Sequence, residues 1–207
     1  MNNRIMIISL NSDPVLQYGT EHNGGQSKYI FELGKNLVKD DWVIDVFTVQ
    51  NPGCEGYTRI TEGFYVYRIG LQEEKEYSYA IEEEDVNQFA DSVIRFVTEN
   101  KLIYDIILCC YWLSGIAGLK LKEILGKNTL ITFCSLGYFK QTATGESQRL
   151  CYRIEKEKYI ARHVDHIIAT SNEEKKVLTK YYQVPRDKIS IIPRGVDTNK
   201  FRKINGL

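Results

Sequence analysis

The sequence lacks the motifs on which several common enzyme classes depend. It has three histidines and no C-x-x-C pair, so neither a histidine-rich metal site nor a zinc-binding cysteine framework is indicated. The G-x-G-x-x-G, G-x-x-x-x-G-K-[ST] and G-x-S-x-G motifs are also absent. These absences remove the main support for a dinucleotide oxidoreductase, a P-loop NTPase or an α/β-hydrolase.

The chain also lacks an excess of charge of either sign. Its 27 Lys and Arg residues balance 27 Asp and Glu residues, which argues against nucleic-acid or anionic-membrane partners. The apolar run 5–10 is too short for a signal peptide or a transmembrane segment, so we expect a cytoplasmic protein. The five cysteines are odd in number and are expected to be reduced and mostly buried, without a bound metal.

Short apolar runs rich in Ile, Val, Phe and Tyr alternate with helix-length segments of 3.6-residue period. This alternation predicts a Rossmann-like α/β fold, doubly wound around a mostly parallel sheet of about seven strands. The predicted strands are Ile5–Leu10, Val43–Val49, Phe64–Ile69, Asp105–Cys110, Thr129–Phe133, His166–Thr170 and Ile189–Pro193.

Five helices are expected between these strands, the first opening near Gly25. The others are expected over about 84–100, 112–125, 146–162 and 172–182, with Ser171 or Asn172 as the N-cap of the last. The range 50–62 contains Pro and Gly and is interpreted as a turn-rich connection. The range 73–85 holds seven carboxylates, and a solvated face is favoured there over a loop at the mouth of a site.

Two glycines precede the first helix, in the segment Gly24-Gly25-Gln26. Glycine lets a ligand approach the backbone closely, and the unpaired N–H groups of a first helical turn suit a phosphate or sugar oxygen. The turn is therefore a candidate anion or polyol site. A packing turn that binds nothing is the alternative.

Several segments in a fixed order resemble the family 4 retaining glycosyltransferases of GT-B fold, in their sucrose-phosphate-synthase-like branch. The resemblance spans essentially the whole chain. The similar segments are Gly24 to Leu37, Asp45 to Thr48, Tyr104 to Gly115 with its "Y-W-x-[SA]-G" turn, Thr132 to Lys140 against "T-x-H-S-L-G-x-x-K", Arg153 to Glu157 against "R-x-x-E", Ile168 to Ser171, and Ile191 to Phe201 against "P-x-G-V-D-x-x-x-F".

The resemblance implies that residues 1–196 form an acceptor-binding domain. Residues 197–207 would begin a linker to a donor-binding domain that this sequence does not contain. The resemblance places Gly24, Gly25 and Gln26 along the cleft where acceptor meets donor. It implies that Tyr111 and Ser135 hydrogen-bond a sugar or sugar-phosphate acceptor, and that Lys140 and Arg153 hold its phosphate, for which an ammonium and a guanidinium are suitable donors.

The pattern departs from the family in two places. Cys134 stands where the family has a histidine facing the donor sugar, and Cys110 or Cys109 stands where a histidine commonly precedes "Y-W". A thiol of ordinary pKa cannot replace an imidazole as a proton carrier. The family's cleft lysine has no counterpart at matching spacing, and Lys75 is left unassigned.

Two functional hypotheses follow. The first is the acceptor half of an enzyme, which binds no cofactor alone and uses a UDP-sugar or other nucleotide sugar together with a donor domain in cis or in trans. The second is a binding module that kept the fold and lost catalysis. An unrelated nucleotide-binding Rossmann enzyme is a third and weaker alternative.

Overall fold

The computed structural model of the chain describes residues 3–15, 24–50, 54–71, 83–198 and 201. Over these residues the chain forms one eight-stranded sheet with strand order β3-β4-β2-β1-β5-β6-β7-β8. Every strand pair is parallel except β3–β4. The strands are β1 (Arg4–Ile8), β2 (Val43–Val49), β3 (Tyr57–Thr61), β4 (Phe64–Ile69), β5 (Ile106–Cys110), β6 (Asn128–Thr132), β7 (His166–Ala169) and β8 (Ile189–Ile191).

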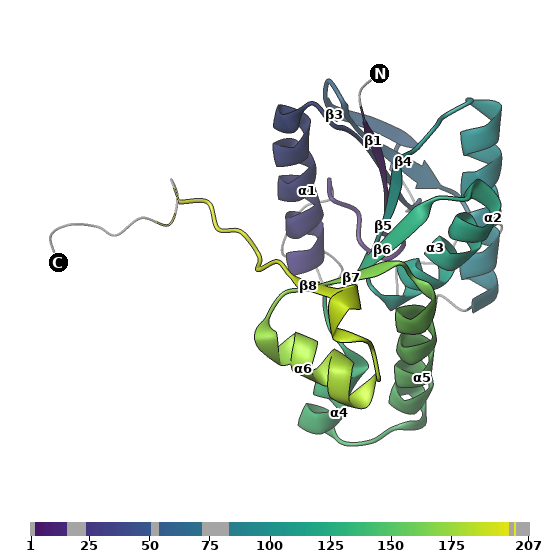
Figure 1. The fold of residues 1–207 in the computed structure, drawn as a ribbon. Helices are drawn as coiled ribbons and strands as arrows, with labels where there is room; N and C mark the ends of the chain where they lie inside the picture. The colour runs from purple at the N-terminus through teal and green to yellow at the C-terminus, as the bar shows by residue number, and fades with distance from the viewer. Residues whose placement is uncertain (1–2, 16–23, 51–53, 72–82, 199–200, 202–207) are drawn as a thin grey trace, which may run out of the picture.

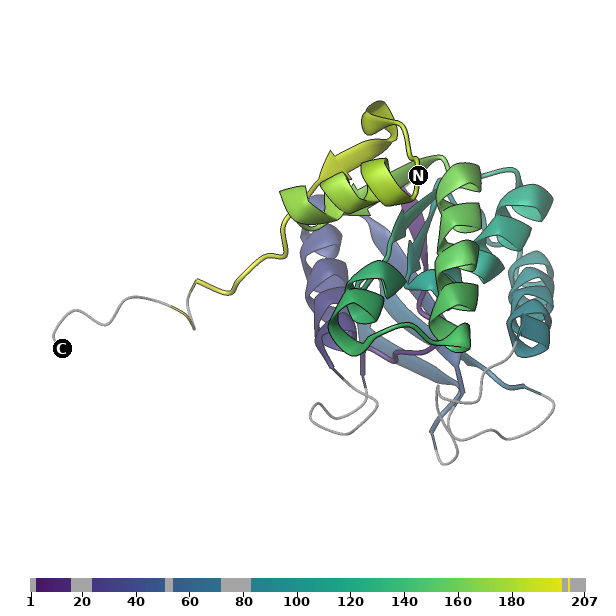
Figure 2. The ribbon, with the colours of Figure 1, turned by 90° about the horizontal axis from the view of Figure 1, so that it is seen from below.

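Helices cover both faces of the sheet, with α1 on one face and α2, α3 and α5 on the other (Figures 1 and 2). Right-handed crossovers require this arrangement, because the chain leaves β1 toward β2 in one direction and later adds β5 to β8 in the other. The helices are α1 (Gly25–Leu37), α2 (Glu83–Glu99), α3 (Trp112–Leu125), α4 (Gly137–Thr144), α5 (Gln148–His163) and α6 (Asn172–Tyr181), with 3-10 turns at Val38–Asp40 and Arg186–Lys188.

The sheet separates two apolar clusters. The larger cluster contains Met6, Phe47 and Cys109 under α2, α3 and α5. The smaller contains Ile7, Phe64 and Cys110 under α1. Cys109 and Cys110 are adjacent in a strand and therefore point to opposite faces.

The predicted fold class is confirmed, and all seven predicted strands are present within a residue or two at their ends. Two elements were missed. The edge strand β3 lies in the range interpreted as a turn-rich connection, because its residues alternate between exposed and half-buried and give no apolar run. Helix α4 was missed because it is short and buries only Gly137 among its residues.

Serine side chains cap the N-termini of two helices. The Ser147 hydroxyl accepts a hydrogen bond from Leu150 N at the start of α5, and the Ser171 hydroxyl accepts one from Glu174 N at the start of α6. Ser171 is thus the N-cap, one of the two predicted residues. Helix α1 differs, because its N-cap is Gly24 and no side chain caps it.

Some expectations fall outside the described residues, namely those for Lys75 and for most of the acidic range 73–85. The predicted boundary near residue 196 stays a prediction. Among the helices of the described part, none combines the length and apolar character that crossing a membrane requires.

Helix α3 packs against β5 so closely that a methyl group at Gly118 would overlap the Cys109 sulfur. We expect Gly118→Ala to lower the free energy of unfolding, because overpacking costs about 1–3 kcal/mol. That cost exceeds the roughly 1 kcal/mol that alanine gains over glycine in a helix. In a Cys109→Ala background the same change is expected to be neutral or stabilising. Urea denaturation of the four chains measures the difference, and an equal cost in both backgrounds would contradict this packing.

Candidate functional site

The carboxyl ends of β1 and β5 form the point where strand order reverses. β1 pairs with β2 on one side and with β5 on the other. The helices that follow β1 and β5 therefore lie on opposite faces, and neither helix start covers the boundary between the two strands. Open α/β sheets bind ligands at such a switch point.

Gln26, in the first turn of α1, bridges the ends of the two strands with its side chain. Its side-chain Nε2 donates to the Ser9 hydroxyl at 3.2 Å and to the Cys110 carbonyl at 3.3 Å, and these residues directly follow or end β1 and β5. Gly24 and Gly25 are exposed, and a methyl group on either would meet no atom within 4 Å. The backbone at the start of α1 is therefore open to a ligand, with the positive end of the helix dipole directed toward it.

The segment after β1 is fixed by hydroxyl contacts. The Ser9 hydroxyl donates to the Ser12 carbonyl at 2.6 Å, and the hydroxyls of Ser12 and Ser27 share a hydrogen bond of 2.6 Å. All three serines are buried. Because Ser27 belongs to the first turn of α1, these contacts fix where the glycine turn lies relative to β1.

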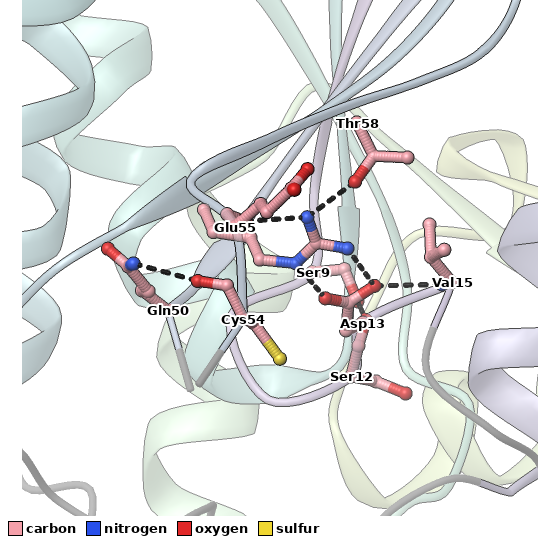
Figure 3. A network of polar contacts seen from close by, with 9 residues as sticks. Ser9, Ser12, Asp13, Val15, Gln50, Cys54, Glu55 and Thr58 are labelled. Carbon is pink, nitrogen blue, oxygen red and sulfur yellow. Dashed lines mark hydrogen bonds and ion pairs between the residues drawn. The ribbon is translucent and has the colours of Figure 1, made fainter. Parts of the chain in front are cut away.

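Asp13 continues this segment and forms a buried ion pair with Arg68 from the end of β4 (Figure 3). Arg68 Nε donates to Asp13 Oδ2 at 2.5 Å, and the side chains are 4% and 0% exposed. Arg68 Nη1 also donates to the Glu55 carbonyl and the Thr58 hydroxyl, and Val15 N donates to Asp13 Oδ1. The pair therefore fastens the segment after β1 to the β3–β4 hairpin.

Tyr111, Ser135 and Arg153 come together on the other side of the switch point. The Arg153 guanidinium lies 4.9 Å from the centre of the Tyr111 ring and donates from Nη2 to the Ser135 carbonyl. Tyr111 has φ of 82° and ψ of 160°, a conformation that is nearly restricted to glycine and costs about 1–3 kcal/mol. Its ring is thus held in place against a local backbone preference.

The carboxylate of Glu157 fixes the position of Arg153 through a network of buried hydrogen bonds. It is fully buried and accepts hydrogen bonds from Arg153 Nε at 2.7 Å, from the Tyr182 hydroxyl at 2.5 Å and from Gly137 N at 2.9 Å. Burial raises the pKa of Glu157, while Arg153 and Tyr182 act in the opposite direction. Arg153 is 7% exposed and its Nε is paired with Glu157, so the predicted phosphate contact of Arg153 would have to use its remaining N–H groups.

Cys134 occupies a strained turn at the end of β6. Its φ is 60°, and Ser135 N donates to the Phe133 carbonyl at 2.6 Å, which is the hydrogen bond of a γ-turn in its rarer form. Arg194 Nη2 donates to the Cys134 sulfur at 3.3 Å. The Arg194 guanidinium also lies 3.4 Å from the centre of the Tyr29 ring on α1. Arg194 therefore connects the end of the sheet to α1.

Lys140 lies on α4, one turn after Gly137, and is exposed. Among the described residues no carboxylate forms an ion pair with it. The structure thus connects six of the seven predicted acceptor residues and Cys134 along the carboxyl edge of the sheet, with Lys140 at its rim. Sequence reasoning gave no role to Asp13, Arg68 or Arg194. In the described ranges no three potential metal ligands cluster together.

Residues 23–200 match the profile described as Glycosyltransferase Family 4. The chain belongs to this family. One relative, the mannosylfructose-phosphate synthase of Agrobacterium fabrum, is 30% identical over 88% of this chain and 43% of the relative. The D-inositol 3-phosphate glycosyltransferase of Corynebacterium glutamicum is 25% identical over 96% of this chain and 48% of the relative.

A solved structure supports the same assignment for this family 4 chain. The sucrose-phosphate synthase of Thermosynechococcus elongatus superposes with a TM-score of 0.87 at 25% identity, over 98% of this chain and 50% of that one. The fold is therefore that of the N-terminal domain of a GT-B glycosyltransferase, as the sequence predicted. The chain spans about half the length of the curated relatives it matches.

Removing one partner of the Asp13–Arg68 pair should destabilise this family 4 domain strongly. Arg68→Met leaves the Asp13 carboxylate buried without its counter-charge, so we expect a loss of about 3–5 kcal/mol in the free energy of unfolding. Lys176→Ala, which removes an exposed ion pair with Glu173, should cost less than about 1 kcal/mol. Urea denaturation gives both values, and similar small losses would show that the pair contributes little.

Proposed function

We propose that this chain is the acceptor-binding domain of a retaining, nucleotide-sugar-dependent glycosyltransferase. The observation that carries the proposal is that Gln26 joins the open start of α1 to the ends of β1 and β5 at the switch point, where Tyr111 directly follows β5. An uncapped helix start offers N–H donors to an anion, and a tyrosine offers both an apolar face and a hydroxyl to a sugar.

We propose a phosphorylated acceptor, a sugar phosphate or an inositol phosphate. The printed names of the relatives support this choice, because they name mannosylfructose phosphate and inositol 3-phosphate. The exposed ammonium of Lys140 and the first turn of α1 are the donors we assign to the phosphate. Arg153 then acts mainly by fixing Tyr111 and Ser135, through the contacts described above.

We further propose that a donor-binding domain, in cis or in trans, supplies the nucleotide-sugar pocket, with a UDP-sugar as one candidate donor. Two solved neighbours are described in complex with UDP and glucose and with UDP-glucose, at 14% and 13% identity, so they support the shared fold alone. The alternative of an inactive binding module rests on Cys134 at the family's histidine position. The cytoplasmic location expected from the sequence also stays a prediction.

Calorimetric titration of the chain with hexose phosphates and inositol phosphate tests acceptor binding. We expect one of these ligands to bind more tightly than its unphosphorylated counterpart and than inorganic phosphate. Lys140→Ala should weaken that binding about tenfold, because a charge-assisted hydrogen bond contributes roughly 1.5 kcal/mol. Lys176→Ala, an exposed lysine on α6, is the matched control and should leave the affinity unchanged. A panel without any response would refute the acceptor site.

Fusion to a donor-binding half tests whether the domain supports catalysis. The chain joined to the second half of the Agrobacterium fabrum relative should transfer sugar from a nucleotide sugar to the acceptor identified by calorimetry, and the unfused chain should not. Thin-layer or mass-spectrometric detection of the product measures transfer. A folded fusion that binds both substrates without transfer would favour the binding-module alternative.

A further inference from the structure

Two cysteine side chains meet at the centre of the candidate site. Cys110 ends β5, Cys134 follows β6, and the two strands are neighbours in the sheet. Both side chains belong to the apolar cluster on the face of the sheet that α1 covers, and each lies close enough to shift the pKa of the other. Cys109 points to the opposite face, so Cys110 and Cys134 form a pair that excludes it.

The surroundings of Cys134 favour its thiolate. The neighbouring Cys110 thiol and the guanidinium of Arg194 lower the pKa of Cys134, against the effects of burial and of the Glu174 carboxylate. Glu174 is already bonded to Thr170 N and to the Thr170 hydroxyl. The remaining titratable neighbour is Tyr29, whose pKa burial raises to about 12, so Tyr29 adds no negative charge near neutral pH.

The solvent exposure and the backbone geometry of Cys134 also favour reaction at its sulfur. Cys134 is half-buried, whereas Cys110 is fully buried. Of these two thiols, Cys134 is therefore the one that a small solute can reach from the solvent. The γ-turn holds its side chain beside Arg194, which can donate a hydrogen bond to a negatively charged sulfur.

We propose that Cys134 is a reversible thiol-oxidation site, with Cys110 as its resolving thiol and a peroxide as the oxidant. In the first step the Cys134 thiolate attacks one peroxide oxygen, the O–O bond breaks, and the leaving hydroxide takes up a proton to give water and a sulfenic acid. In the second step the Cys110 sulfur attacks the sulfenic sulfur, the S–O bond breaks, and hydroxide leaves with the Cys110 proton as water. A dithiol reverses the resulting disulfide by exchange.

A disulfide at this position would act on the neighbouring ligand contacts. The Cys110 carbonyl accepts the hydrogen bond from Gln26, and Cys134 directly precedes Ser135. A disulfide restricts the separation of its two Cα atoms to about 4.4–6.8 Å, which constrains both backbones at the edge of the sheet. We infer that oxidation lowers acceptor affinity, an effect that rests on the proposed function, whereas disulfide formation does not.

The chain supplies its own control cysteine. Cys151 is also half-buried, but its thiol is hydrogen-bonded to the Glu146 carboxylate, which raises its pKa. The reduced chain should therefore be alkylated by iodoacetamide severalfold faster at Cys134 than at Cys151, as read by peptide mass spectrometry. Equal rates, or faster modification of Cys151, would overturn the proposal.

Oxidation of the whole chain with dilute hydrogen peroxide tests the pairing. After remaining thiols are blocked, peptide mapping should show the peptide of Cys134 linked to the peptide of Cys109 and Cys110, and dithiothreitol should release it. The link should persist in Cys109→Ala and Cys151→Ala and be absent in Cys110→Ala, with thermal melting confirming that each variant is folded. The proposal is overturned if oxidation of Cys134 stops at the sulfenic or sulfinic acid while Cys110 is present. It is also overturned if the link survives Cys110→Ala.

Calorimetry on the oxidised chain separates the two proposals. We expect the affinity for the sugar-phosphate or inositol-phosphate ligand to fall at least severalfold on oxidation and to recover with dithiothreitol. In Cys110→Ala, which cannot form this disulfide, the same peroxide treatment should lower the affinity less. Unchanged affinity in the disulfide-linked chain would refute the regulatory effect. If the reduced chain binds none of the ligands while the disulfide forms, the proposed function fails and the oxidation site stands.

Discussion

The right-handedness of the β-α-β crossovers determines where this domain can bind a ligand. Right-handed crossovers place α1 on one face and α3 on the other, so the carboxyl ends of β1 and β5 stay uncovered between them. The other features of the site depend on that boundary. Gln26 bridges it, the serines after β1 fix the start of α1 beside it, and Tyr111 directly follows β5.

Two buried ion pairs hold the loops at the carboxyl edge of the sheet in one arrangement. Asp13 with Arg68 secures the segment after β1, and Glu157 with Arg153 secures the loop after β6. Desolvating such pairs costs several kcal/mol per ion, so a buried ion pair adds little net stability to the fold. Their extra hydrogen bonds to backbone groups define loop positions instead, which is what a ligand site on loops requires.

The sequence predicted what depends on local pattern and could not predict what depends on pairing across the chain. Apolar runs such as Ile106 to Cys110 reveal buried parallel strands, whereas β3 exposes alternate residues at a sheet edge and leaves no such run. The glycine turn was recognisable because it precedes an amphipathic helix. Asp13 and Arg68 lie 55 positions apart, and Cys134 and Arg194 lie 60 apart, so only the fold reveals these contacts.

The backbone of Tyr111 has a consequence for the stability of the fold. A glycine there would remove the conformational cost that its φ of 82° imposes. The aromatic ring, held under the Arg153 guanidinium, thus occupies this place at a cost in folding stability, as the trade-off between stability and function at binding sites predicts.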